Sequence, residues 1–284
     1  MLIDVHAHIF PPAFIQNRRA LAQQEPFFAL MYADLKSPMA HHEQLLDTMQ
    51  SGQVDASWAV GFTWQEEKNA VAHNDYLISL ASEKRLYCLG AIWAKAPWAL
   101  AEARRILMAG LRGLGELGFY QSDIDVEALS PFCHLCADFN VPLMLHVNEP
   151  VGAAYAGKAP MGLTRIYRLI KENPATKFIL SHLGGGLFFY LLLKKEVRNT
   201  MANVWLDSAA APYLYESRAL KMAVELMGAD KVLLGSDYPL LSPARHLAQM
   251  RDAGLSEDEL DLVCGRNAGK LMAAQAQAPQ TLCV

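Results

Sequence analysis

Short apolar runs alternate with longer amphipathic stretches from one end of the chain to the other. Runs of strand length occur near residues 2–8, 55–62, 86–93, 112–119, 141–147, 177–182, 203–207 and 231–236. Some of them, such as Leu143-Met144-Leu145, are continuously apolar, which is typical of parallel strands that are covered on both faces. We therefore expect eight buried parallel strands.

Amphipathic stretches of helix length lie between these strands. Examples are Glu66–Lys84, Trp98–Ala109, Leu163–Glu172 and Tyr215–Met227. Eight strand–helix alternations of this length are typical of a (β/α)8 barrel, so we predict one α/β domain over residues 1–284. The alternative is an open doubly wound sheet, but no Gly-x-Gly-x-x-Gly motif follows the first strand.

Two segments extend the barrel pattern. The first βα loop, from Ile9 to about Ala40, is long and carries five aromatic side chains: Phe10, Phe14, Phe27, Phe28 and Tyr32. Such a loop is typical of a lid or binding insert, and its aromatics can equally form a small separate core. An extra C-terminal helix is predicted at Ser256–Ala274, where Ser256 and Glu259 form a capping box. We expect residues 275–284 to fray.

Composition excludes several classes of protein. A formal net charge of −4 is mild, which makes a nucleic-acid partner unlikely and argues against a charged membrane surface. No apolar run approaches the ~20 residues of a membrane span, and no secretory signal is visible, so we expect a cytoplasmic protein. The odd number of cysteines, 5, does not suggest a disulfide framework. Cys133 and Cys136 share a helix face, and we expect them to pack in the core.

The sequence His6-Ala7-His8 ends the first predicted strand and places two imidazoles on one face. Further donors lie at or near the ends of later strands: Glu116 in strand four, His146 in strand five, His182 in strand six and Asp237 in strand eight. Catalytic groups of such barrels sit at the C-terminal ends of the strands. Four imidazoles and two carboxylates meeting there predict a divalent-metal site, with zinc favoured by the nitrogen-rich set.

These residues also carry a family resemblance. His6-Ala7-His8, the later His146 and His182, and Gly-Ser-Asp-Tyr-Pro at 235–239 resemble the amidohydrolase superfamily, especially its amidohydrolase-related, or predicted TIM-barrel metal-dependent hydrolase, group. The segment 266–271 resembles the Asn-Ala-x-x-Leu closing helix of that group. The resemblance covers nearly the whole chain and implies a (β/α)8 barrel with one or two divalent ions.

Glu116 departs from the members of the superfamily that use a carboxylated lysine on strand four. It is more similar to the glutamate of TatD-type branches, which binds or bridges metals. That resemblance implies one ion held by His6, His8, Glu116 and Asp237, and a second held by His146, His182 and Glu116. It favours a two-metal hydrolase, because decarboxylase members do not need this carboxylate. An ordinary ion pair of Glu116 with Arg112 is the structural alternative.

The ligand set suggests the chemistry. A bound divalent cation lowers the pKa of its water from ~16 toward ~7 and so provides hydroxide at neutral pH. Asp237 is the predicted general base or proton shuttle, and His182 is predicted to combine ligation with polarisation of the substrate. We therefore predict a hydrolase of a small amide, ester or lactone that uses zinc, or alternatively manganese or iron. A homo-oligomer is possible.

Three other functions stay open. The first alternative is a non-oxidative decarboxylase or hydratase of the same superfamily. A TatD-like phosphodiesterase and a non-catalytic metal-binding barrel are the others. Counting bound ions and comparing lactones, amides and carboxylic acids as substrates would separate them.

Several residues near the strand ends are candidates for substrate binding. The candidates are Trp64, Tyr120, Asn148, Glu149 and Lys158. Lys158 suits a carboxylate or phosphate, although most lone loop lysines are solvated.

The remaining polar residues near the strands have two interpretations each. Asp4 could orient an imidazole or have only structural partners, and Asp207 could contact substrate or cap the next segment. Gly184–Gly186 could cradle an anion or form a close-packed turn. We expect His41, His42 and His73 on helix surfaces.

Overall fold

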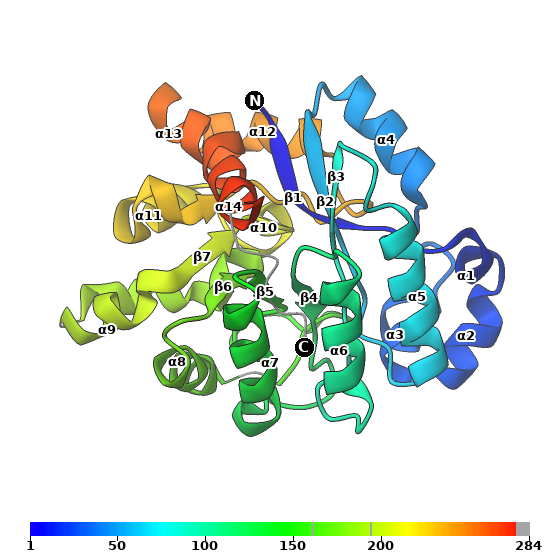
Figure 1. Cartoon of the computed structure of the whole chain (residues 1–284). Coiled ribbons are helices and arrows are strands. Elements are labelled where there is room, and N and C mark those ends of the chain that lie inside the picture. The colour runs from blue at the N-terminus through cyan, green and yellow to red at the C-terminus, as the bar shows by residue number, and fades with distance from the viewer. Residues whose placement is uncertain (161, 194, 277–284) are drawn as a thin grey trace.

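Eight short parallel strands form the centre of the computed structural model, which describes residues 1–160, 162–193 and 195–276 (Figure 1). The strands are β1 (Ile3–His8), β2 (Ala56–Val60), β3 (Leu86–Leu89), β4 (Leu114–Leu117), β5 (Pro142–Leu145), β6 (Lys177–Leu180), β7 (Val204–Asp207) and β8 (Val232–Leu233). Each of them lies inside one of the eight predicted runs. The predicted order of strands is therefore confirmed.

The strands pair in chain order around a barrel. β1 to β3 form one sheet and β4 to β8 form a second, and every pair of neighbouring strands is parallel. A bridge between Gly90 and Leu114 joins β3 to β4, and a bridge between Ala7 and Tyr238 joins the end of β8 to β1. The Val5 amide also donates to the Leu234 carbonyl at 2.8 Å. These bonds connect the two sheets at both pairs of edges, as the predicted (β/α)8 barrel requires.

Helices surround the strands (Figure 1). The longer ones after the insert are α4 (His42–Ser51), α5 (Glu67–Ser79), α6 (Ala99–Met108), α7 (Val126–Asp138), α8 (Leu163–Glu172), α11 (Arg218–Met227) and α12 (Pro243–Asp252). Shorter pieces are α9 (Lys195–Thr200), α10 (Ala211–Leu214) and 3-10 turns at Met201–Asn203 and Ala229–Lys231. Four predicted helices are found in place, of which α5 and α11 are shorter than predicted because turns take up their ends.

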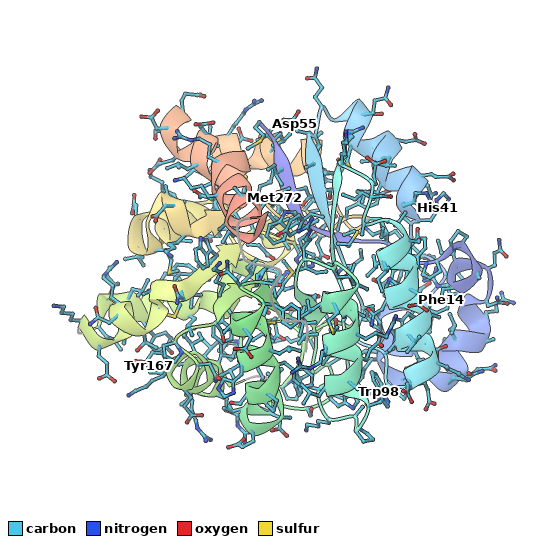
Figure 2. The ribbon with its side chains drawn as sticks, in the orientation of Figure 1. Phe14, His41, Asp55, Trp98, Tyr167 and Met272 are labelled. Atoms are coloured by element: carbon cyan, nitrogen blue, oxygen red, sulfur yellow. The ribbon has the colours of Figure 1, made fainter. Side chains whose placement is uncertain are left out.

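The first βα segment, residues 9–40, folds into three short helices and is called the insert below. They are α1 (Pro12–Gln16), α2 (Arg18–Gln24) and α3 (Pro26–Tyr32), and Figure 1 shows them beside α5. The insert aromatics form a separate cluster with Phe62, Trp64 and Tyr120 from the barrel loops. Phe14, labelled in Figure 2, has its ring 5.0 Å from that of Trp64. The small separate core is therefore the observed arrangement.

The predicted C-terminal helix is divided by a π-helical turn. Its parts are α13 (Glu257–Asp261), the π turn (Leu262–Arg266) and α14 (Asn267–Ala276), and the Ser256–Glu259 capping box is present. In the π turn the Val263 carbonyl accepts from the Leu234 amide at 2.9 Å, so a carbonyl of the helix bonds to the chain after β8. α14 packs against buried side chains of β1 and β2. The rest of the predicted frayed tail, 277–284, lies outside the described residues.

Three further expectations concern burial. Cys133 and Cys136 are buried on α7, as predicted. Among the described residues, no helix has the length and apolar character needed to cross a membrane. The prediction of His73 as a surface residue is wrong, because its ring donates to the Ile9 carbonyl at 2.8 Å and accepts from Trp64 at 2.9 Å. The insert covers the face of α5 that carries His73, and without the insert this face would be exposed to solvent.

Candidate metal centre

All six predicted donors meet at the C-terminal end of the barrel. One group contains His6, His8 and Asp237, and the other contains Glu116, His146 and His182. In the first group, His6 Nε2 is 3.2 Å from His8 Nε2, which is 3.6 Å from Asp237 Oδ1. Ligands about 2.1 Å from a shared ion lie roughly 3–3.5 Å apart. The spacing therefore fits a divalent cation.

Glu116 connects the two groups. Its Oε1 lies 3.2 Å from His146 Nδ1 and 3.8 Å from His6 Nε2, and its Oε2 lies 3.6 Å from His8 Nε2. His182 Nε2 is 3.2 Å from His146 Nδ1, which completes the second group. The two oxygens of Glu116 thus face imidazoles of both groups. This carboxylate could serve one ion or bridge two.

The outer nitrogens of three imidazoles are bonded to the protein. His6 Nδ1 meets Asp207 Oδ2 at 2.9 Å, His182 Nδ1 meets the Ala209 carbonyl at 2.9 Å, and His146 Nε2 meets the Gly157 carbonyl at 2.8 Å. Each of these acceptors requires an N–H, which leaves the lone pair of a neutral ring on the inner nitrogen. The inner nitrogens are those that face Glu116, as a metal site needs.

The charges of the cluster favour a cation. Burial opposes protonation of His6, but the carboxylates of Asp207 and Glu116 outweigh it and raise the His6 pKa to about 10. Burial likewise opposes ionisation of Glu116, yet His146 and His6 hold its pKa well below the usual range. Ionised carboxylates that hold a proton on a neighbouring imidazole this strongly would also attract a metal ion, which competes with that proton for the imidazole nitrogen.

Asp207 rather than Asp4 orients an imidazole. Besides His6, Asp207 accepts from the backbone amides of His182 and Ala209, both at 3.0 Å. The interpretation of Asp4 as an imidazole acceptor is wrong. Its carboxylate accepts from the Ser236 amide at 2.8 Å, the Ser236 hydroxyl at 2.6 Å and the His6 backbone amide at 3.2 Å. Burial raises the Asp4 pKa to about 6.

The loop after β6 is a close-packed left-handed turn. His182 through Gly186 all have positive φ, and they open the 3-10 helix His182–Leu192. A Cβ on Gly185 would lie 2.4 Å from the Asn148 carbonyl, so only glycine fits against the β5 loop. Asp237 also has a positive φ of 63°. These conformations are uncommon outside glycine, and here they occur at the two predicted catalytic residues.

Five of the six donors, all except His6, line a cavity of about 140 Å³. It is lined by His8, Met31, Tyr32, Ser37, Pro38, Phe62, Glu116, Tyr120, His146, His182, Asp237, Pro239 and Leu240. A cavity of ~150 Å³ holds a benzene molecule, so the volume suits a substrate with one small ring. The insert supplies Met31, Tyr32, Ser37 and Pro38 of this wall, and therefore serves the site as well as forming its own core.

Of the five predicted substrate-binding residues, the structure places only Tyr120 at the cavity. Trp64 is buried in the insert core and donates to His73 at 2.9 Å. Asn148 bonds to backbone atoms of Glu149 and Ala159. Lys158 donates to Glu149 Oε1 and to the Val151 carbonyl, both at 3.0 Å. These contacts make Asn148, Glu149 and Lys158 organisers of the β5 loop.

Sequence reasoning did not assign the rest of the cavity wall. The sequence marks Tyr32 only as an aromatic residue of the insert. It does not mark Phe62, Met31 or Leu240 as site residues. No periodic signal marks them, since their position depends on how the insert and loops pack. The pairing of Asp207 with His6 was also missed, although its position at the end of β7 was a usable signal.

A parallel barrel with imidazoles and carboxylates gathered at its C-terminal end defines a class of metal-dependent enzymes. The sequence profile of the Amidohydro_2 family, described as amidohydrolase, matches residues 3–272. The chain therefore belongs to this family. Among curated proteins, none matches the chain.

Solved structures with the same fold include three decarboxylases. 5-Carboxyvanillate decarboxylase from Sphingomonas paucimobilis has a TM-score of 0.74 and 18% identity, covering 96% of this chain and 98% of that one. The enzyme from Novosphingobium aromaticivorans, with manganese and 4-hydroxy-3-methoxy-5-nitrobenzoic acid, has a TM-score of 0.75 and 15% identity, with 96% of both chains covered.

The third is a dihydroxybenzoic acid decarboxylase from Polaromonas sp. JS666 with bound manganese and the inhibitor 2-nitroresorcinol. Its TM-score is 0.70 at 16% identity, and the match covers 96% of both chains. At such low identities the likeness establishes the fold. Together with the family match it identifies an enzyme of the amidohydrolase superfamily with candidate groups for a divalent metal.

Proposed function

We propose that this protein is a divalent-metal-dependent, non-oxidative decarboxylase that acts on a small planar carboxylic acid. The observation that carries this proposal is one cavity that is lined by five of the six donors and by a wall of Tyr32, Phe62 and Tyr120. The donors suit the acidic end of a substrate, and the aromatic wall suits its ring. The decarboxylases of the same fold, two of them with manganese, support this reaction and this metal.

The lone pairs of the cluster are arranged for ligation. His6, His146 and His182 present lone pairs, and Glu116 and Asp237 present oxygens, so these residues and His8 would hold the ion. When bound, a divalent ion supplies positive charge that binds the substrate and withdraws electron density from the bond to be broken. Manganese and zinc both accept nitrogen and oxygen ligands, and the carboxylates and the manganese-containing neighbours favour manganese.

Asp237 is the proposed proton carrier. Its side chain is 16% exposed, whereas that of Glu116 is 2% and that of Asp207 is 0% exposed, so Asp237 is the one of these three carboxylates that can exchange a proton directly with solvent. In the proposed step the carbon–carbon bond to the carboxylate breaks, carbon dioxide leaves, and the electron pair remains on carbon. The Asp237 carboxyl then delivers its proton to this carbon and is protonated again from solvent.

Release of carbon dioxide tests the proposal. Protein reconstituted with manganese or zinc is incubated with 2,6-dihydroxybenzoate and related acids, and carbon dioxide and bound metal are measured. We expect turnover that is lost on chelation and falls at least about 100-fold in Asp237→Asn. His134→Gln, which changes an exposed histidine on α7, is the matched control and should retain full activity.

A metal-dependent hydrolase is the second candidate, because Glu116 lies between the two donor groups as a bridging carboxylate would. Two ions per chain together with cleavage of lactones or amides, and no carbon dioxide from any acid, would establish this alternative and refute decarboxylation. One ion per chain with carbon dioxide release would exclude it.

A further inference from the structure

Two buried phenols face the cavity without a partner in the protein. Tyr32 is 8% exposed and Tyr120 is 4% exposed, and both line the cavity. Among the described residues, neither hydroxyl forms a hydrogen bond. Buried hydroxyls are normally bonded, so these two are available to a ligand. They are the only tyrosines among the residues that line the cavity.

Packing fixes both rings. Tyr32 lies against Phe10 and Phe28 with ring centroids 5.1 Å apart in each case. Tyr120 stacks on Phe62 at 5.8 Å with an interplanar angle of 11°. A Cβ on Gly118 would lie 2.4 Å from the Tyr120 ring and 2.8 Å from its hydroxyl oxygen. The residue after β4 therefore has to be glycine, because the Tyr120 ring lies directly against it. Rings held this tightly give their hydroxyls a defined position.

No lysine or arginine is found among the residues lining the cavity in the described part of the chain. Lys158 is bonded to Glu149 and to carbonyls of its own loop. Arg18 of the insert donates to the carbonyls of Tyr32 and Asp34. The wall instead contains the carboxylates of Glu116 and Asp237. A second carboxylate on a substrate would therefore be buried without a cation beside like charges, which is strongly unfavourable.

The tyrosine hydroxyls are suited to uncharged or phenolic oxygens. A tyrosine hydroxyl is protonated at neutral pH, so each can act as a donor. A neutral donor pairs with a hydroxyl or ether oxygen without a net charge, whereas a free carboxylate needs a cation to offset its desolvation.

We propose that Tyr32 and Tyr120 determine specificity by binding the oxygen substituents of a ring with one acidic group, and that the cavity rejects diacids. This inference rests on the proposed function, because the metal end of the cavity would hold the single acidic group. The inferred substrate, with its single acidic group, therefore differs from a diacid such as 5-carboxyvanillate.

Binding of three matched ligands to the full-length, manganese-loaded protein tests the inference by calorimetry. The first ligand is 2-nitroresorcinol, the second is 3,5-dihydroxy-4-nitrobenzoate, which adds one carboxylate, and the third is the amide of the second. The amide matches the acid in size without its charge. We expect the amide to bind at least about tenfold more tightly than the acid.

Two variants test the tyrosines. Tyr32→Phe and Tyr120→Phe should each weaken binding of 2-nitroresorcinol by about three- to tenfold, the loss of one hydrogen bond. Tyr213→Phe, at an exposed position of α10, is the control and should bind as the unaltered protein does.

The outcomes separate this inference from the proposed function. Equal binding of acid and amide, failure of all three ligands to bind, or unchanged binding by both phenylalanine variants would overturn the inference. Release of carbon dioxide from 5-carboxyvanillate would also overturn it, while leaving the decarboxylase proposal in place. Discrimination between acid and amide without carbon dioxide release from any acid would support the inference and contradict the decarboxylase.

Discussion

At the residue scale, Asp207 links elements that are far apart in the chain. Its Oδ2 accepts from His6, 201 positions earlier, and its Oδ1 accepts from the backbone of His182 and Ala209. One carboxylate thus fixes both a ring of the first donor group and the backbone of the second. The sequence could predict the donors, since strand ends in a barrel converge, but this pairing depends on rotamers and on burial from several strands.

Replacing Asp207 with asparagine should lower metal affinity by about 10- to 100-fold, because an amide is a weaker acceptor for the His6 N–H. Titration of the metal-free protein against a chromophoric chelator measures the change. Asp4→Asn is the matched control, since Asp4 bonds to Ser236 and to a backbone amide but to no imidazole. We expect less than a threefold change there. An equal loss in both variants would contradict the assigned role of Asp207.

Two buried histidines outside the donor cluster should make stability depend on pH. Burial lowers the pKa of His73 and of His246 to about 4, against an ordinary value of 6.5. The unfolded chain therefore binds protons that the folded chain does not. Each group contributes up to about 3 kcal/mol, which is fully present above pH 6.5 and is lost as the pH falls toward 4.

Urea unfolding of the metal-free protein at pH 7 and at pH 5 measures this effect. His73→Gln offers a donor for Ile9 and an acceptor for Trp64 without the titration of the ring, and should reduce the loss of stability between these pH values by about 2 kcal/mol. His134→Gln, at an exposed site, should leave the loss unchanged. A pH dependence that is the same in all three proteins would refute burial of a neutral His73.

At the element scale, the insert depends on a few specific contacts. Glu25, between α2 and α3, is buried and accepts from the amides of Gln65 and Glu66 and from Asn69. Glu25 therefore bonds to the start of α5 and holds the first residue of α3 in place. Tyr32 is the last residue of α3. The sequence predicted the barrel helices from their periodicity. It could not predict this segment, whose three short helices carry no sustained periodic pattern.

Glu25→Ala should destabilise the protein by about 2 kcal/mol, because it leaves buried donors without partners. It should also raise KM more than it lowers kcat, since Tyr32 and Met31 move while the metal donors stay in place. Chemical denaturation and steady-state kinetics measure the two effects. Glu67→Ala, at an exposed position of α5, should change stability by less than about 0.5 kcal/mol. Loss of bound metal in Glu25→Ala would contradict this separation.

At the scale of the whole molecule, strand order was predictable because each parallel strand is an apolar run bounded by turns. The division of the last helix was not, since Ser256 to Ala274 reads as one continuous amphipathic stretch. Within its π turn, the Val263 carbonyl accepts from the Leu234 amide in the chain after β8. Contacts of this kind depend on barrel closure, which no local pattern encodes.

The donors are spread from His6 to Asp237 over strands at both ends of the chain. During synthesis, a ribosome must release most of the polypeptide before the last ligand can reach the first. The complete ligand set would therefore form only after residue 237 has left the ribosome. A truncated product that ends before residue 237 would keep the donor group of Glu116, His146 and His182 but would lack Asp237, the proposed proton carrier.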